Sequence, residues 1–315
     1  MLIPNQRICV GIIEDLHKQI LVGKRKRGVH LAECWEFPGG KLESHESFKI
    51  ALRRELHEEL GIHAHTLQKL IEFQHQYKDR HLHFQVFKVS GFRGHVKSCE
   101  GQDLQWISPN QLAQLDFPAA NAAMLDALTM PDTYMIADRD VFGDRLFSIV
   151  EKQLKAGVSL IQYRAKNEDK AIYIKNAKQL IALCAKSGAK LVCNVDVSVA
   201  NEIGLQAIHL NSSRLREAHQ QLPHYKNINV FSASCHNEEE VVMANALGVR
   251  CVLIGSVNKT RSHTDLQELG WNRFSQLCVI ANCPVYALGG MSLEDCHNAR
   301  VYGAQGIAAI RAFNI

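Results

Sequence analysis

No stretch of this sequence approaches the roughly 18 consecutive apolar residues that a membrane-spanning helix needs, so we expect no membrane span. No run of Lys and Arg with interleaved aromatic residues is present, and the formal charge of +4 is too small to indicate binding to polymeric nucleic acid. The ten cysteines are scattered and form no CxxC pair, which favours reduced thiols over a disulfide framework. The opening residues lack the basic segment and long apolar core of a secretory signal. These absences together predict a cytoplasmic protein.

The length of the chain predicts two domains. A chain of 315 residues is too long for one typical domain, and 46% apolar residues can form a sizeable core. The pattern changes near Met130–Thr133, so we predict one domain at residues 1–130 and another at 131–315. The first reads as an α+β domain. Its strands are expected at 7–13, 19–23, 81–89 and 103–107, with a further strand in 35–40 that ends in a Pro-Gly-Gly break, and its main helix at 47–60, before Gly61.

The second half of the sequence repeats one pattern. Short apolar strands are followed in most cases by helical segments, and each strand ends in polar or glycine residues. The strands begin near residues 134, 158, 190, 207, 229, 251, 284 and 306. Eight such units predict a closed parallel (β/α)₈ barrel, with an open doubly wound sheet as the alternative.

The predicted helix at 47–60 carries three carboxylates close together. At about 100° per residue, Glu55, Glu58 and Glu59 fall within a sector of roughly 100° that borders the apolar stripe of the helix. Like charges at this spacing repel one another, and partial burial increases the repulsion. A bound hard cation relieves it, so the pattern predicts a site for Mg²⁺, with Mn²⁺ as a substitute.

The sequence around this helix resembles the Nudix box, G-x5-E-x7-R-E-U-x-E-E-x-G-U, where U is aliphatic. Every fixed position is filled, in order, by Gly40, Glu46, Arg54, Glu55, Leu56, Glu58, Glu59, Gly61 and Ile62. The resemblance implies the Nudix fold, a mixed sheet sandwiched by helices.

Residues 7 to about 128 are most similar to the MutT type of this family, the 8-oxo-dGTP diphosphatases. The similar segments are EFPGGK at 36–41, YKDRH at 77–81, CEGQ at 99–102 and FPAAN at 117–121. The resemblance implies metal binding by Gly39, Glu55, Glu58, Glu59 and Glu100, with Arg54 holding the glutamates in place. It implies nucleotide contacts from Arg25, Lys41, Arg80 and Asn121. Without the resemblance, a turn or helix-entry residue is the other interpretation of Asn121.

The activity implied is hydrolysis of a small-molecule nucleotide, 8-oxo-dGTP, to 8-oxo-dGMP and pyrophosphate. Water attacks the β-phosphorus in line, and one of the box glutamates or Glu100 acts as the base. The amide of Asn121 can read a purine edge because it offers both a donor and an acceptor. The role implied is sanitation of the nucleotide pool.

Residues 134–315 resemble the thiamine phosphate synthase/TenI family, a small TIM barrel. The residues that carry the resemblance are Gln162, Arg164, Lys166, Asn194, His209, Ser232, Ser234, His236, Gly289 and Gly290. They imply a ligand site at the barrel mouth, with the Gly-Gly turn holding a phosphate. A plain tight turn is the other interpretation of that pair.

The sequence also departs from this family. The synthases carry a metal-binding aspartate directly after the Asn of the third strand, where Val195 stands here. The second follows the His of the fourth strand, where the stretch 211–214 contains no acid. Asp196 is one residue along, and strand alternation would point it to the opposite face. The phosphate loop T-x-T-K corresponds to residues 260–263, Thr-Arg-Ser-His.

Synthase activity is therefore not expected of the barrel. A TenI-like role, a sensor of a phosphate ligand that regulates the first domain, and a homodimerisation module remain open. A Nudix hydrolase acting on another diphosphate linked to thiamine metabolism is the alternative function of the whole chain.

Overall fold

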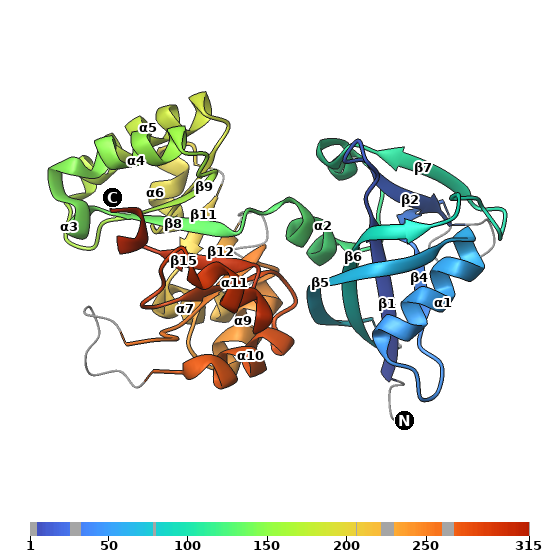
Figure 1. Ribbon diagram of the computed structural model, residues 1–315. Helices are drawn as coiled ribbons and strands as arrows, with labels where there is room; N and C mark the ends of the chain where they lie inside the picture. Colours follow the sequence, from blue (N-terminus) through green and yellow to red (C-terminus); the bar gives the residue numbers. More distant parts are fainter. Residues whose placement is uncertain are drawn as a thin grey trace. The chain divides into compact units, whose positions relative to one another are not determined.

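The computed structural model describes residues 5–25, 33–77, 80–205, 207–221, 230–259 and 268–314. The chain divides into two compact units, Met1–Thr129 and Met130–Ile315. Figure 1 colours them from blue to green and from green to red. In the described ranges, no helix has the length and apolar character needed to cross a membrane.

The first unit has two sheets. The four-stranded sheet has the order β4-β1-β6-β5, and β1 pairs parallel with β6. The three-stranded sheet has the order β3-β2-β7 and is antiparallel. The strands are β1 (Asn5–Ile13), β2 (Ile20–Lys24), β3 (Trp35–Glu36), β4 (Gly39–Lys41), β5 (His63–Gln76), β6 (His81–Arg93) and β7 (Asp103–Ile107). The helical segments are α1 (Phe48–Leu60), η1 (Pro109–Gln114) and α2 (Asn121–Thr129).

Helix α1 has clear start and stop signals. The Ser47 side chain accepts a hydrogen bond from the Ile50 backbone N–H, and Gly61 ends the helix with φ 67°, a left-handed conformation that favours glycine. The apolar stripe packs into one core with residues of β1, β5 and β6. That stripe comprises Phe48, Ala51, Leu52, Leu56 and Leu60. The predicted helix is confirmed, and its packing fixes which way the remaining side chains point.

Two strands of this unit were not expected. The strand expected to end at the Pro-Gly-Gly break is β3, and beyond Pro38, which lacks an N–H, the chain forms β4 in the other sheet. The long strand β5 was not expected at all. Its register against β6 shifts between Ala64 and Thr66, at Leu67, and between Lys69 and Ile71, so its side chains do not alternate evenly.

The second unit is a closed barrel of parallel strands in the order β10-β11-β12-β13-β14-β15-β8-β9. This confirms the (β/α)₈ prediction, and the open sheet is wrong. The strands are β8 (Thr133–Asp138), β9 (Leu160–Arg164), β10 (Lys190–Cys193), β11 (Ile208–Leu210), β12 (Val230–Cys235), β13 (Cys251–Ile254), β14 (Val285–Leu288) and β15 (Gly306–Ala309). The described helices are α3 (Arg139–Phe142), α4 (Leu146–Lys155), α5 (Lys170–Lys186), α6 (Val197–Glu202), α7 (Ser212–Gln220), α9 (Glu238–Leu247), α10 (Gly270–Ile280) and α11 (Asp295–Val301), with short 3₁₀ turns η2 (Gly143–Arg145) and η3 (Arg311–Phe313).

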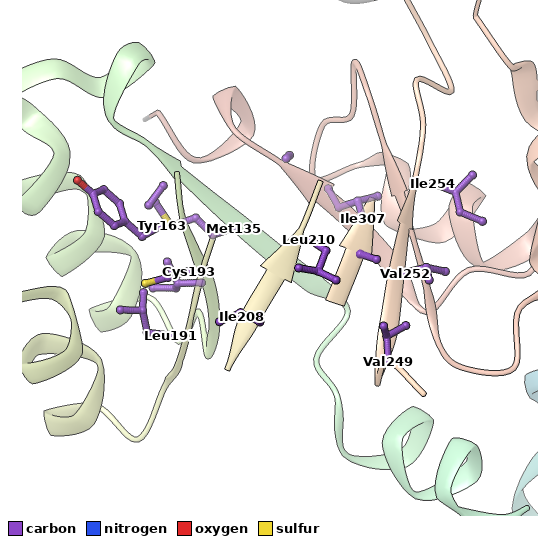
Figure 2. Packing of buried hydrophobic residues seen from close by; sticks show 14 of the residues in the cluster. Met135, Tyr163, Leu191, Cys193, Ile208, Leu210, Val249, Val252, Ile254 and Ile307 are labelled. Carbon is purple, nitrogen blue, oxygen red and sulfur yellow. The ribbon is translucent and has the colours of Figure 1, made fainter. Parts of the chain in front are cut away.

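Alternation along each barrel strand separates two cores. On β9, Ile161 and Tyr163 join the large core between the strands and the surrounding helices, part of which Figure 2 shows. Leu160 belongs instead to the core inside the barrel, with Val192, Tyr286 and other residues. By the same alternation, the polar residues at the carboxyl ends of the strands point inward, toward the mouth of the barrel.

Candidate active site

The site in the first unit is built on the glycine pair of β4. A Cβ on Gly39, which has φ 143°, would lie 2.2 Å from the Cys9 carbonyl oxygen, so only glycine fits. The Cys9 thiol donates to the Gly40 carbonyl (3.4 Å) from the neighbouring strand. Burial raises the pKa of Cys9 to about 11, so this thiol stays protonated. Strand β1 therefore packs against one side of the glycine pair and fixes its position.

Two glutamates of α1 reach this glycine pair from the other side. The Glu59 Oε2 atom accepts from the Gly39 backbone N–H at 3.2 Å. The Glu55 carboxylate lies directly against Gly40, where an added Cβ would be 2.3 Å from Glu55 Cδ. The close approach of backbone and carboxylates explains why a strand that begins with two glycines precedes an acidic helix.

The carboxylates of this site raise one another's pKa. Burial raises the pKa of Glu59 to about 8, and the charges of Glu55, Glu100 and Glu36 add to the effect. Burial also raises the pKa of Glu55, against the opposing effect of Arg54. Without a bound cation, the carboxylates of this site therefore do not all ionise readily.

Arg54 connects the acidic residues. Its Nε and Nη2 atoms each donate to Glu46 at 2.9 Å, and its Nη1 atom donates to Glu55 (2.9 Å) and Glu58 (3.0 Å). Nη2 also donates to the Lys41 carbonyl at 3.1 Å. The guanidinium lowers the pKa of Glu46 to about 2. One planar, five-donor side chain thus ties the loop before α1 to the carboxylates on the helix.

Glu100 is brought to the helix by a loop that is fastened to the end of α1. The Lys97 N–H donates to the Leu60 carbonyl (3.1 Å), and the Cys99 N–H donates to the Glu59 carbonyl (2.9 Å). These bonds use the last carbonyls of the helix, which have no partner within it. Glu100 lies close enough for its charge to raise the pKa of both Glu55 and Glu59.

The residues expected to contact a nucleotide lie on several elements. Arg25 follows β2 and forms an ion pair with Glu36 (2.5 Å). Arg80 is half-buried between β5 and β6, where its carbonyl accepts from the Tyr77 N–H. The side chain of Lys41 is exposed at the end of β4.

Asn121 is the first residue of α2 and is only 8% exposed. Its backbone N–H donates to the Pro118 carbonyl at 2.9 Å, which makes it a helix-entry residue as well as a candidate base reader. Four residues earlier in the sequence, the Phe117 ring stacks on Phe37 with centroids 5.2 Å apart. Both rings belong to the core that α2 covers.

Sequence reasoning missed two residues of this site, Glu36 and Cys9. Burial raises the pKa of Glu36, and its charge acts on Glu59. Cys9 reaches the site only because β1 pairs with β4, in the register Cys9 opposite Gly40. The only sequence signal for Glu36 was its place in the segment EFPGGK, where an acidic residue directly precedes the residues Phe-Pro-Gly-Gly.

The mouth of the barrel contains a second group of polar residues. The His209 side chain is buried between the Ser232 and Ser234 hydroxyls, each at 2.9 Å from a ring nitrogen. Arg164 forms an ion pair with the fully buried Asp138. Burial lowers the pKa of His209 to about 3, and the charges of Arg164 and Arg214 add to this, so the ring is neutral near pH 7.

Other residues expected at the mouth lie in different environments. His236 is exposed, and its Nδ1 atom lies 2.9 Å from the buried Glu240 carboxylate and 3.0 Å from the Ser212 hydroxyl. Gly289 and Gly290 form a tight turn at φ 99° and 67°. A Cβ on Gly289 would lie 2.1 Å from Ser256 Oγ, so close packing accounts for the first glycine. Residues 260–263 lie outside the described part of the chain.

Asp196 departs from its expected orientation. Strand β10 ends at Cys193, so strand alternation does not extend to Asp196. Its carboxylate forms an ion pair with Arg214 Nε at 2.6 Å instead of pointing to the opposite face. Arg214 Nη1 also donates to the Asn194 side chain at 2.7 Å.

Comparison with known proteins assigns both units. Residues 133–313 match the family described as thiamine monophosphate synthase, and residues 9–127 match the NUDIX domain family. A relative in Aquifex aeolicus (strain VF5), named as a thiamine-phosphate synthase, is 32% identical over 187 residues, which are 59% of this chain and 99% of the relative. The 8-oxo-dGTP diphosphatase of Escherichia coli (strain K12) is 34% identical over 122 residues, which are 39% of this chain and 95% of the relative.

The chain belongs to both families. A solved thiamine phosphate pyrophosphorylase from Pyrococcus furiosus shares the barrel fold, with a TM-score of 0.50 and 23% identity over 62% of this chain and 89% of that one. Several cyanobacterial thiamine-phosphate synthases are matched over only about half of their length, for example 48% of the one from Synechococcus sp. (strain WH7803). The NUDIX domain supports assignment of the chain as a pyrophosphohydrolase.

The NUDIX site suits a hard divalent cation by its donor chemistry. The Glu55 carboxylate lies against Gly40, and the Glu59 carboxylate accepts from the Gly39 N–H, so oxygen atoms of two carboxylates lie close to the glycine backbone. Across the described ranges, no three His, Cys, Asp or Glu side chains are already gathered as metal ligands. Arg54 holds Glu55 and Glu58, and Gly39 holds Glu59, so binding a cation requires these side chains to turn. Oxygen donors of this kind are those that Mg²⁺ and Mn²⁺ prefer.

Proposed function

We propose that the NUDIX domain hydrolyses 8-oxo-dGTP to 8-oxo-dGMP and pyrophosphate with Mg²⁺. The observation that carries the proposal is the approach of Glu55 and Glu59 to the glycine pair, with Glu100 near enough for its charge to act on both and Arg54 bonded to the helix carboxylates. The likeness to an 8-oxo-dGTP diphosphatase supports the choice of substrate.

In this mechanism the acidic residues and the glycine backbone hold the cation. Glu55, Glu58, Glu59, Glu100 and the Gly39 carbonyl are the proposed ligands. When bound, Mg²⁺ neutralises the charge that develops on the phosphate oxygens.

The protein side chains do the remaining work. One carboxylate of the cluster accepts the proton of the water that attacks the β-phosphorus. Arg54 keeps the carboxylates oriented through its hydrogen bonds to Glu55 and Glu58.

We propose that Arg25, Lys41, Arg80 and Asn121 contact the nucleotide. The cationic residues suit phosphate or sugar oxygens. The amide of Asn121 can donate to one atom of a purine edge and accept from its neighbour, and its low exposure favours discrimination between bases.

Hydrolysis of a substrate panel tests the proposed specificity. We expect kcat/KM for 8-oxo-dGTP to exceed that for dGTP by orders of magnitude, with 8-oxo-GTP, ADP-ribose and thiamine diphosphate as the other substrates. Asn121→Ala should reduce the ratio between 8-oxo-dGTP and dGTP, whereas Asn110→Ala, on the exposed surface of η1, should not. Preference for thiamine diphosphate would instead support a function linked to the family of the barrel.

Removal of one carboxylate tests the chemistry. We expect Glu55→Gln to lower kcat by about a hundredfold or more in saturating Mg²⁺, because the amide removes a charge that faces the phosphates. Glu14→Gln removes a surface carboxylate paired with Lys18 and should leave kcat unchanged. Hydrolysis by Glu55→Gln within a few-fold of wild type would overturn the proposal.

A further inference from the structure

The mouth of the barrel is lined by side chains from successive strands. Asp138 ends β8, Gln162 and Arg164 belong to β9, Asn194 follows β10, and His209 belongs to β11. On β9, Gln162 and Arg164 have the parity of Leu160, which lies in the core inside the barrel. These residues therefore face one interior space above the apolar core.

Helix α7 adds an arginine to this group. The Asn211 side chain caps the helix and accepts from the Arg214 backbone N–H at 3.0 Å, which fixes Arg214 in the first turn. From there the guanidinium reaches Asn194 and Asp196, at 2.7 and 2.6 Å. Arg214 is thus the residue of the stretch 211–214 that points to the end of β10.

This arrangement does not fit the divalent cation that the family resemblance implies for the barrel. Val195 is 6% exposed and lies in the core between strands and helices, so it offers no oxygen. The nearby acid, Asp196, is already neutralised by Arg214. Asp138, the acid at the end of β8, is neutralised by Arg164. A divalent cation could bind these two carboxylates only by displacing the arginines that are paired with them.

Lys166 adds to the mouth a positive charge that neither aspartate of these two ion pairs balances. Arg164 lowers the pKa of the exposed Lys166, and Arg164 and Arg214 both lower the pKa of His209 after burial, so both guanidinium charges act on the mouth. A guanidinium fork can bind phosphate oxygens with the N–H groups that its carboxylate partner leaves unused.

One buried group indicates that a ligand belongs here. The Gln162 side chain is 2% exposed, and its Oε1 atom has no hydrogen-bond partner among the residues that the structure describes, although buried acceptors are nearly always satisfied. It lies on the same face of β9 as Arg164, two residues away. A molecule that enters the mouth with an N–H or O–H group would satisfy it.

We propose that the barrel mouth binds a small phosphorylated molecule directly through Arg164 and Arg214, without a divalent cation. The phosphate lies against the two guanidinium groups, and an N–H or O–H donor of the same molecule reaches Gln162 Oε1. Because a diphosphate has no metal clamp there, the site binds its ligand without activating a diphosphate leaving group.

Calorimetric titration of the full chain with inorganic pyrophosphate in EDTA tests this proposal. The titration uses the Glu55→Gln variant, in which a proposed metal ligand of the NUDIX site is changed. In this variant we expect saturable binding of pyrophosphate, and Mg²⁺ should not increase its affinity. Arg214→Gln should weaken binding at least about tenfold, because it removes a charge-assisted contact. Arg273→Gln removes an arginine of α10 that is paired with Glu238 of α9 and should have no effect.

The outcomes separate this site from the NUDIX site. Binding that needs Mg²⁺, binding that is absent in EDTA, or equal affinity in wild type and Arg214→Gln would each overturn the proposal. If Arg214→Gln lowers the midpoint of thermal unfolding, Arg214→Lys is measured in its place. Lysine keeps the positive charge but lacks the forked guanidinium group, so this variant should also weaken binding. Hydrolysis of 8-oxo-dGTP should be unaffected by Arg214→Gln, so failure of one proposal does not imply failure of the other.

Discussion

At the scale of single residues, Arg54 makes more hydrogen bonds than any of the carboxylates that it contacts. Lysine keeps the charge but cannot bind Glu46, Glu55 and Glu58 at once. We therefore expect Arg54→Lys to lower kcat about tenfold or more with a smaller change in KM, because the carboxylates lose their orientation.

The adjacent arginine offers the control for this substitution. Arg53 donates from Nε to the Ala64 carbonyl and lies away from the carboxylates. Arg53→Lys should leave kcat within a few-fold of wild type, as measured by steady-state hydrolysis. Equal losses in both variants would mean that helix stability, and not carboxylate orientation, limits the reaction.

The spacing of the glutamates was enough to place Glu55, Glu58 and Glu59 on one helix. It could not place Glu36 or Cys9, because their positions depend on pairing between strands that are distant in sequence. The orphaned Gln162 oxygen is likewise a property of packing, and no spacing in the sequence indicates it. Periodicity in the sequence indicates the faces of one helix or strand at a time, whereas a functional site is formed by residues from several elements.

At the scale of elements, barrel closure depends on a close contact at the start of β15. A Cβ on Gly306 would lie 1.8 Å from the Asp132 carbonyl oxygen, which accepts from the Ile307 N–H at 3.0 Å. We expect Gly306→Ala to destabilise the barrel by about 3 kcal/mol or more, because backbone must move where β8 meets β15. The measurement is the free energy of unfolding in urea.

Gly204→Ala is the matched control. Its Cβ would meet nothing within 4 Å, and its φ of 68° costs an alanine only about 1 kcal/mol. If Gly306→Ala were no more destabilising than Gly204→Ala, closure would not depend on this contact.

The barrel strands were predictable because each is a short apolar run bounded by polar residues or glycine. Strands β5 and β4 were not, since bulges disturb the alternation of β5 and the three-residue β4 follows the break at Pro38. Sequence patterns thus identified regular elements and failed where tertiary pairing imposes an irregular one.

At the scale of the whole molecule, the two units should respond differently to acid. Burial and two arginines hold the folded pKa of His209 at about 3, below the 6.5 of an unfolded histidine. The unfolded barrel therefore binds more protons between these values, and its stability falls as pH drops below 6.5, by up to about 1.4 kcal/mol per pH unit.

In the NUDIX unit, His83, Gln85 and Lys69 hold the pKa of Glu72 at about 2, so this stabilisation is lost only below about pH 4.5. Thermal scans in phosphate-free buffer from pH 7 to 4.5 should show the barrel transition moving down. His209→Gln should flatten that dependence, and Glu72→Gln should not. An unchanged slope in His209→Gln would rule out this histidine as the cause.

The order of strands in the barrel has a consequence for synthesis on the ribosome. Strand β8 lies at the start of the barrel sequence but is paired on one side with β15, near residue 309. The growing chain can complete the NUDIX unit once residue 129 has emerged, whereas β8 must wait for about 170 further residues before its second partner exists. During that interval one edge of the nascent sheet is open, and it is the stage at which chaperones would protect this protein most.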